Sequence, residues 1–222
     1  DFSAEMERTL QVLDYAILVI NGADGVQGHT MTLWKLLKRY QVPVFIFVNK
    51  MDQPGTDKEK TLAELQKKLD VNCIDYNGQN KDCLYDTAAM CSETLMEEYL
   101  NTGKISDEAM NEAIGHRQIF PCLFGSALKM EGVKELLAFM DAHMQRREYP
   151  EEFGARVFKI VRDEQDNRLT YMKITGGSLK VKAMLTDYHE GMEPSECWQE
   201  KADQIRLYSG GTYAVSYTHL RA

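Results

Sequence analysis

The chain has 222 residues, 44% of them hydrophobic, which is enough to build the cores of two modest domains. Its formal net charge of −8 argues against a protein that binds nucleic acid over its whole surface by charge alone. The longest apolar stretch, around residues 16–20, is far shorter than the roughly 20 residues of a transmembrane helix, so we expect no membrane partner. The five cysteines are odd in number and form no Cys-x-x-Cys pair, which favours reduced thiols in a cytoplasmic protein.

Helices and strands alternate in the first part of the chain. Residues 3–11 suggest a short helix, and residues 13–20 are almost wholly apolar and β-branched, as in a buried strand. Apolar residues at helical spacing then predict an amphipathic helix that ends near Tyr40. A second apolar strand follows at 42–48, and a helix with a charged outer face follows at 58–69. This order predicts a parallel α/β sheet, in which ligands bind beyond the carboxyl ends of the strands.

The second strand runs directly into Asn49-Lys50-Met51-Asp52. An ionised carboxylate has two acceptor oxygens in one plane, so Asp52 can accept from both the N1–H and the exocyclic amine of guanine. Adenine lacks this pair of donors, and such a site can reject it by roughly 10⁴-fold. The stem of Lys50 can lie over the base, and the amide of Asn49 can tie neighbouring loops together. For these four residues alone, the alternative is an ordinary polar turn after a strand.

Residues 71–116 interrupt the alternation because they are polar and acidic, and we interpret them as an insertion with helical stretches at 92–100 and 107–116. The sheet resumes with an apolar strand at 119–124, and a helix at 133–144 closes the domain.

A Ser-Ala pair follows the 119–124 strand. It is common in isolation, but it supplies the other half of a guanine pocket if the N–H of Ala127 donates to guanine O6, since the amine of adenine could not accept that hydrogen bond. Both motifs follow a strand, and they occur in this order. The sequence therefore predicts a guanine-binding site formed by Asn49, Lys50, Met51, Asp52, Ser126, Ala127 and Leu128.

The composition changes after Tyr149-Pro150. Residues 155–162 and 169–175 flank a polar turn at 163–167, which is a hairpin signal, and short strands continue beyond Gly177. We expect the C-terminal part of a GTP-binding domain at 1–149 and a partial all-β barrel domain at 150–214. Residues 215–222 depart from what precedes them, and we expect a non-native tail there.

Two kinds of site are absent from the sequence. It contains no Gly-x-x-x-x-Gly-Lys-Ser/Thr loop, which GTPases use to wrap phosphates with backbone N–H groups. His29 and His116 have no partners at metal-ligand spacing, so no metal site is predicted. Because the chain also begins at Asp1 without an initiator Met, we expect an internal fragment of a longer protein.

Several segments resemble the translational GTPases. Residues 1–10 resemble the segment that follows the Asp-x-x-Gly-His motif of that family. Residues 24–27, 32–34, 48–52, 125–128 and 157–160 resemble elongation factor G and its relatives. Gln53 and the form of the insertion resemble tetracycline-resistance ribosomal protection proteins more closely, because housekeeping elongation factor G usually has Arg at that position.

The resemblance implies a partial P-loop-type GTPase domain whose N-terminal strands lie before Asp1. It implies a cytoplasmic, monomeric protein that binds GTP and GDP, docks on the RNA and proteins of the ribosome, and is released after hydrolysis. The P-loop, the ligands of Mg²⁺ and the catalytic His are expected before Asp1, so no catalytic residue is assigned within this chain and the chain alone is expected to be inactive.

Three interpretations stay open at this point. The first is a ribosome-dependent GTPase of the protection or elongation type. The second is another translational GTPase, such as a peptide-release or ribosome-recycling factor. The third is a non-catalytic module that binds guanine nucleotides or the ribosome.

Overall fold

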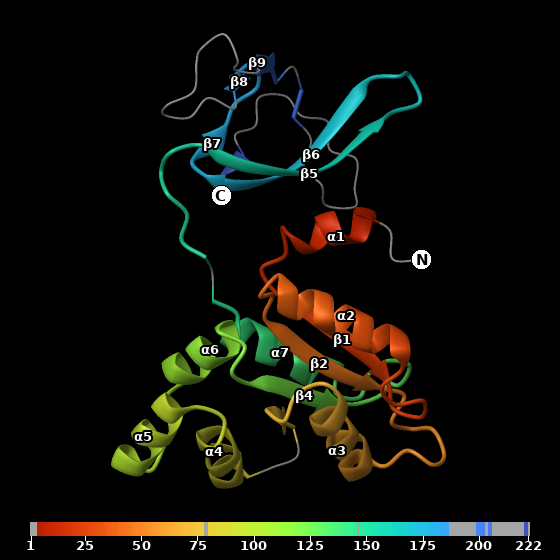
Figure 1. Ribbon diagram of the computed structural model, residues 1–222, viewed down its shortest axis with the longest axis vertical. Coiled ribbons are helices and arrows are strands. Elements are labelled where there is room, and N and C mark those ends of the chain that lie inside the picture. Colours follow the sequence, from red (N-terminus) through yellow and green to blue (C-terminus); the bar gives the residue numbers. More distant parts are fainter. Residues whose placement is uncertain are drawn as a thin grey trace. The chain divides into compact units, whose positions relative to one another are not determined.

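The computed structural model in Figure 1 describes residues 4–77, 80–145, 147–186, 199–202, 204–205 and 220–221. The chain divides into two compact units, Asp1–Arg147 and Glu148–Ala222. Apart from Leu220–Arg221, the tail expected at 215–222 lies outside the described residues. Residues 1–3, part of the segment that resembles translational GTPases, lie outside them as well.

The first unit is built on a four-stranded sheet with the order β1-β2-β4-β3. Each neighbouring pair of strands is parallel, as the sequence predicts. Both faces of a parallel sheet are covered, which explains why these strands are apolar at nearly every position. The strands are β1 (Ala16–Asn21), β2 (Val44–Asn49), β3 (Cys73–Asp75) and β4 (Phe120–Phe124). The expected α/β fold is therefore confirmed.

Helices cover both faces of the sheet (Figure 1). Successive side chains of a strand point to opposite faces, so Ile46 packs with α2 and α3 whereas Phe45 packs with α7. Trp34 of α2 meets Phe120 edge to face, with ring centroids 4.7 Å apart. The helices of this unit are α1 (Ala4–Leu10), α2 (Gly28–Arg39), α3 (Lys58–Lys68), α4 (Lys81–Ala89), α5 (Glu93–Thr102), α6 (Asp107–Gly115) and α7 (Val133–His143).

The strand predicted at 42–48 begins two residues later than expected. The N–H of Val42 donates to the carbonyl of Leu37 at 3.0 Å, so this residue still closes the end of α2. Pro43 has no N–H to donate to a ladder. Gln41 has a left-handed φ of 53°, which turns the chain from helix to strand. The β2 strand therefore starts at Val44.

The segment interpreted as an insertion contributes a strand to the sheet. β3 pairs in parallel with β4, in a register that sets Cys73 opposite Phe120. The sequence did not predict β3 or α4, since a strand of three residues is too short to show a period. The predicted helical stretches at 92–100 and 107–116 correspond to α5 and α6.

A buried histidine links α7 to this segment. His143 is 4% exposed, and its Nδ1 lies 2.6 Å from Oδ1 of Asn111 in α6. Because that oxygen can only accept, Nδ1 carries the proton and Nε2 accepts from the hydroxyl of Tyr76 at 2.9 Å. Burial lowers the pKa of His143 below its ordinary value.

The second unit consists, in its described part, of antiparallel strand pairs. β5 (Gly154–Arg162) and β6 (Arg168–Gly176) form the predicted hairpin, and Asp163 closes its turn by donating its N–H to the carbonyl of Asn167 at 3.0 Å. The shorter strands are β7 (Ser178–Leu179), β8 (Met184–Thr186), β9 (Gln199–Lys201) and β10 (Leu220–Arg221).

The strand β1 forms one edge of the described sheet. Ile17 and Val19, which are two positions apart and so lie on the same face of the strand, are 42% and 58% exposed. Among the described helices, none has the length and apolar character needed to cross a membrane.

Candidate guanine-binding site

The first candidate loop begins where β2 ends. Asn49 is the last residue of β2, and its Oδ1 accepts from the N–H of Lys50 at 2.8 Å. Lys50 has a left-handed φ of 64°, which turns the chain sharply away from the sheet. Thr56 closes the loop because its hydroxyl donates to the carbonyl of Met51 at 2.8 Å. Asp57 then caps α3 by accepting from the N–H of Lys60.

The second candidate loop begins at the carboxyl end of β4. Ser126 is 1% exposed and exchanges two backbone hydrogen bonds of 3.0 Å with Glu131. Gly125 passes so close to this bridge that an added Cβ would overlap the carbonyl oxygen of Glu131. Gly132 has a left-handed φ of 75° and starts α7 directly afterwards. The tight turn therefore depends on glycine at position 125.

Two hydrogen bonds hold the loops together. The N–H of Met51 donates to the carbonyl of Gly125 at 3.0 Å. The N–H of Ala127 donates to Oδ1 of Asn49 at 2.8 Å. The amide of Asn49 thus ties the neighbouring loop, a role that the sequence suggested for it. The sequence also predicts that the N–H of Ala127 donates to guanine O6. In the structure this N–H donates to Oδ1 of Asn49.

Asp52 points its carboxylate toward the second loop. Its Oδ2 lies 3.4 Å from Nζ of Lys129, and its side chain is 18% exposed although the residue as a whole is exposed through its backbone. A hydrogen bond with the side chain of Ser126, then a backbone hydrogen bond at Asp52 and then the charge of Lys129 hold the pKa of Asp52 below its ordinary value despite partial desolvation. The carboxylate is therefore ionised at neutral pH and can accept hydrogen bonds.

The remaining predicted residues differ in their surroundings. Met51 is partly buried against the core on the α2 and α3 side of the sheet. Lys50 is exposed, and Leu128 is 92% exposed and makes no described contact with the first loop. The structure thus brings together Asn49, Asp52, Ser126 and Ala127 and leaves Leu128 apart.

Sequence reasoning missed two residues that shape the site. Lys129 pairs with Asp52, and Gly22 donates its N–H to the carbonyl of Asn49 at 2.8 Å. The spacing of Lys129, three residues after Ser126, was the available signal for the first. For Gly22 no local signal existed, because its contact depends on the pairing of β1 with β2.

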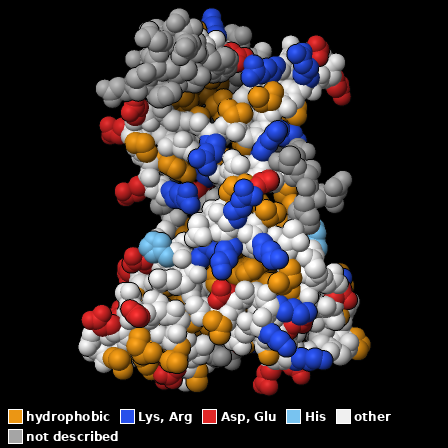
Figure 2. Space-filling model, in the orientation of Figure 1, with side chains coloured by type: hydrophobic (Ala, Val, Ile, Leu, Met, Phe, Trp, Pro, Cys, Tyr) orange, Lys and Arg blue, Asp and Glu red, His pale blue; other side chains and the backbone are white. Residues whose placement is uncertain are grey.

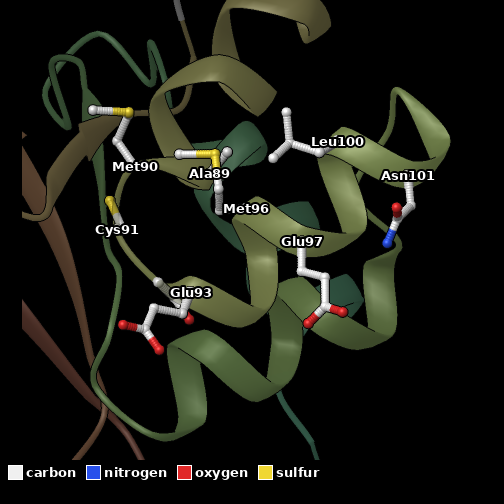
Figure 3. A pocket seen from close by; sticks show the side chains of 9 residues that line it. Ala89, Met90, Cys91, Glu93, Met96, Glu97, Leu100 and Asn101 are labelled. Carbon is white, nitrogen blue, oxygen red and sulfur yellow. The ribbon is translucent and has the colours of Figure 1, made fainter.

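A groove lies away from this site. Its volume is about 550 Å³, it is lined by α5 and by the residues that link α4 to α5, and none of residues 49–52 or 125–129 lines it. In Figure 3, Met90, Met96 and Leu100 gather along one part of the groove, and the carboxylates of Glu93 and Glu97 lie along another. Figure 2 shows hydrophobic side chains exposed beside acidic ones over this end of the unit.

The family resemblance places the expected ligands of Mg²⁺ before Asp1. No group of three or more His, Cys, Asp or Glu side chains that could hold a metal ion occurs among the described residues.

Comparisons with known proteins identify the family of the chain. The family model for the elongation factor Tu GTP-binding domain matches residues 1–146. The chain is 26% identical to "Ribosome-releasing factor 2, mitochondrial" of Drosophila ananassae, over 93% of this chain and 36% of that protein. It is 28% identical to elongation factor G of Ureaplasma urealyticum serovar 10, over 81% of this chain and 36% of that protein. It is 29% identical to the tetracycline resistance protein TetO of Streptococcus mutans, over 83% of this chain and 32% of that protein.

The chain thus spans about a third of the length of the curated relatives it matches. A crystal structure of a Thermus thermophilus protein superposes on 99% of this chain and 39% of its own, with a TM-score of 0.71. Its 18% sequence identity supports a shared fold alone. Because the family model covers well over half of the residues, the chain belongs to the family of the elongation factor Tu GTP-binding domain, the family of the translational GTPases.

Proposed function

We propose that this chain carries the guanine-reading part of the nucleotide site of a ribosome-associated GTPase. The observation that supports the proposal is the 2.8 Å hydrogen bond between Asn49 Oδ1 and the N–H of Ala127. It joins the two loops, so the ionised carboxylate of Asp52 and the Ser-Ala turn lie at the same edge of the sheet. Ligands of parallel α/β sheets bind at that edge.

The base would be read by complementary donors and acceptors. Asp52 accepts from N1–H and the exocyclic amine of guanine, and Ala127 supplies the N–H for O6 by sharing it with Asn49. The stem of Lys50 covers the face of the base, and Met51 and Ser126 hold the two loops in place. Leu128 stays in the proposal as a flanking residue. GTP and GDP carry the same base, so both fit.

The proposal assigns base recognition, and no phosphate chemistry, to residues 1–222. The sequence has no P-loop motif, so we assign neither a catalytic residue nor Mg²⁺ ligands to this chain and expect the chain alone to be inactive as a GTPase. Mg²⁺, when bound to GTP in a complete site, would neutralise charge on the phosphates.

The relatives suggest where the full-length protein acts. Their names refer to ribosome release, elongation and tetracycline resistance. We propose that the full-length protein is a cytoplasmic monomer that hydrolyses GTP on the ribosome, in contact with its RNA and proteins. Protection against tetracycline or elongation-factor-G-like translocation is the proposed role. The alternatives are another translational GTPase, such as a peptide-release or ribosome-recycling factor, and a non-catalytic module that binds guanine nucleotides or the ribosome.

A change of base specificity tests the site. In the longest reading frame that contains residues 1–222, Asp52→Asn should weaken GDP binding by about 100-fold or more and favour xanthosine diphosphate, whose C2 oxygen accepts from the new amide. Asp141→Asn on the exposed side of α7 removes the same charge and should leave both affinities unchanged. Unchanged GDP affinity in Asp52→Asn would refute the assignment.

The role is tested with the same full-length protein. Its GTP hydrolysis is measured with and without ribosomes, and its expression in a tetracycline-sensitive bacterium is scored by growth against the drug. Protection that disappears with Asp52→Asn supports a ribosomal protection protein. Ribosome-stimulated hydrolysis without protection favours the elongation or release role, and nucleotide binding without hydrolysis favours a binding module.

A further inference from the structure

A closed turn holds the backbone of Lys129 beside the loop of residues 49–52. Its N–H donates to Oγ of Ser126 at 3.4 Å. The next residue, Met130, has a left-handed φ of 60° and donates its N–H to the carbonyl of Ala127 at 3.2 Å. This closed turn directs the side chain of Lys129 to Asp52, where the ammonium lies 3.4 Å from Oδ2.

The second loop restrains the Asp52 carboxylate from one side. The ammonium of Lys129 lies 3.4 Å from Oδ2, and the turn that carries Lys129 is closed by the hydrogen bond from its N–H to Oγ of Ser126. A carboxylate has about four lone-pair positions, so those directed away from Lys129 can accept from the N1–H and the exocyclic amine of guanine.

We propose that Lys129, together with Ser126, is a positioning residue that sets the plane of the Asp52 carboxylate for two-point recognition of guanine. This inference rests on the proposed guanine site. The side chain of Lys129 is 53% exposed and that of Asp52 is 18% exposed, so solvent weakens the ion pair itself. Its contribution is therefore the orientation of the carboxylate, and base specificity is the property that reports orientation.

Binding of inosine diphosphate distinguishes a positioning role of Lys129 from a role in the stability of the loop. Its hypoxanthine base lacks the exocyclic amine, so it pairs with Asp52 through N1–H alone. The ratio of the dissociation constants of inosine diphosphate and GDP therefore measures the second hydrogen bond. A hydrogen bond to a charged group should make this ratio about tenfold or more in the wild-type protein.

The test is carried out on the full-length protein that contains residues 1–222. Lys129→Met should lower the ratio by about three- to tenfold, because a freely rotating carboxylate keeps the N1–H contact more readily than both contacts. Lys129→Arg retains a cation and should restore the ratio. Ser126→Ala, which removes the other restraint, should lower it as well. Lys134→Met is the matched control, because Lys134 is exposed on α7 and its ratio should equal that of the wild type.

The outcomes separate the two proposals. A wild-type ratio that falls in Lys129→Met and returns in Lys129→Arg supports the positioning role. If Lys129→Met weakens both nucleotides equally, or leaves both unchanged, the positioning role is overturned while the guanine site stands. If the wild-type protein does not prefer GDP over ADP, the guanine site fails and this inference fails with it.

Discussion

Gly125→Ala should loosen the turn that carries Ser126 and Ala127. The new Cβ would overlap the carbonyl oxygen of Glu131, and it would lie 3.0 Å from the carbonyl carbon of that residue and 3.1 Å from Cα of Gly132. All three atoms belong to the backbone, so no side chain can rotate away. The turn must therefore shift as a whole.

The magnitude follows from the contacts that this shift breaks. The bridge between Ser126 and Glu131 consists of two backbone hydrogen bonds of 3.0 Å, each worth about 1 kcal/mol net. Overpacking of a close-packed backbone adds about 1–3 kcal/mol. We therefore expect the free energy of unfolding to fall by about 3–5 kcal/mol, a large part of the about 5–15 kcal/mol typical of a domain.

Urea denaturation of the 222-residue chain at low concentration measures this change. Gly28→Ala is the matched control, because an added Cβ at Gly28 meets nothing within 4 Å. It should leave the free energy of unfolding unchanged or raise it slightly, since alanine favours helix at the start of α2. Equal stability of Gly125→Ala and Gly28→Ala would contradict the close approach on which the turn depends.

Three further predictions concern other parts of the first unit. Asp57→Ala removes the cap of α3 and should lower the free energy of unfolding by about 1 kcal/mol in urea denaturation, whereas Asp57→Asn should retain most of it. His143 has a pKa below its unfolded value, so its contribution to stability is present above about pH 6.5 and is lost as the pH falls below that value. Urea midpoints between pH 8 and pH 5.5 should therefore fall more steeply for the wild type than for His143→Gln, and parallel curves would contradict the buried hydrogen-bond chain. Val19 is 58% exposed on the edge strand β1, so Val19→Lys should reduce self-association of the 222-residue chain in sedimentation velocity. An unchanged monomer fraction would contradict self-association through this edge strand.

Much of the candidate site was visible in the sequence because the relevant signals are local. Asn49 and Asp52 directly follow an apolar strand, and Ser126 and Ala127 directly follow another. Parallel strands end at the same edge of a sheet, so two such motifs can be expected to meet. The sequence could not show that Asn49 Oδ1 accepts from the N–H of Ala127, because that contact joins residues 78 positions apart.

The sequence by itself determined the alternation of helices and strands in the first unit and the hairpin in the second, because hydrophobic period and turn residues act over a few neighbouring positions. Only the tertiary structure decided that the three-residue β3 lies beside β4, and that Val42 donates its N–H to Leu37 of α2 instead of starting β2. It also decided that Lys129 faces Asp52. These features depend on contacts between distant segments, and such contacts leave no period in the sequence, because each forms only after the rest of the sheet has brought its partners together.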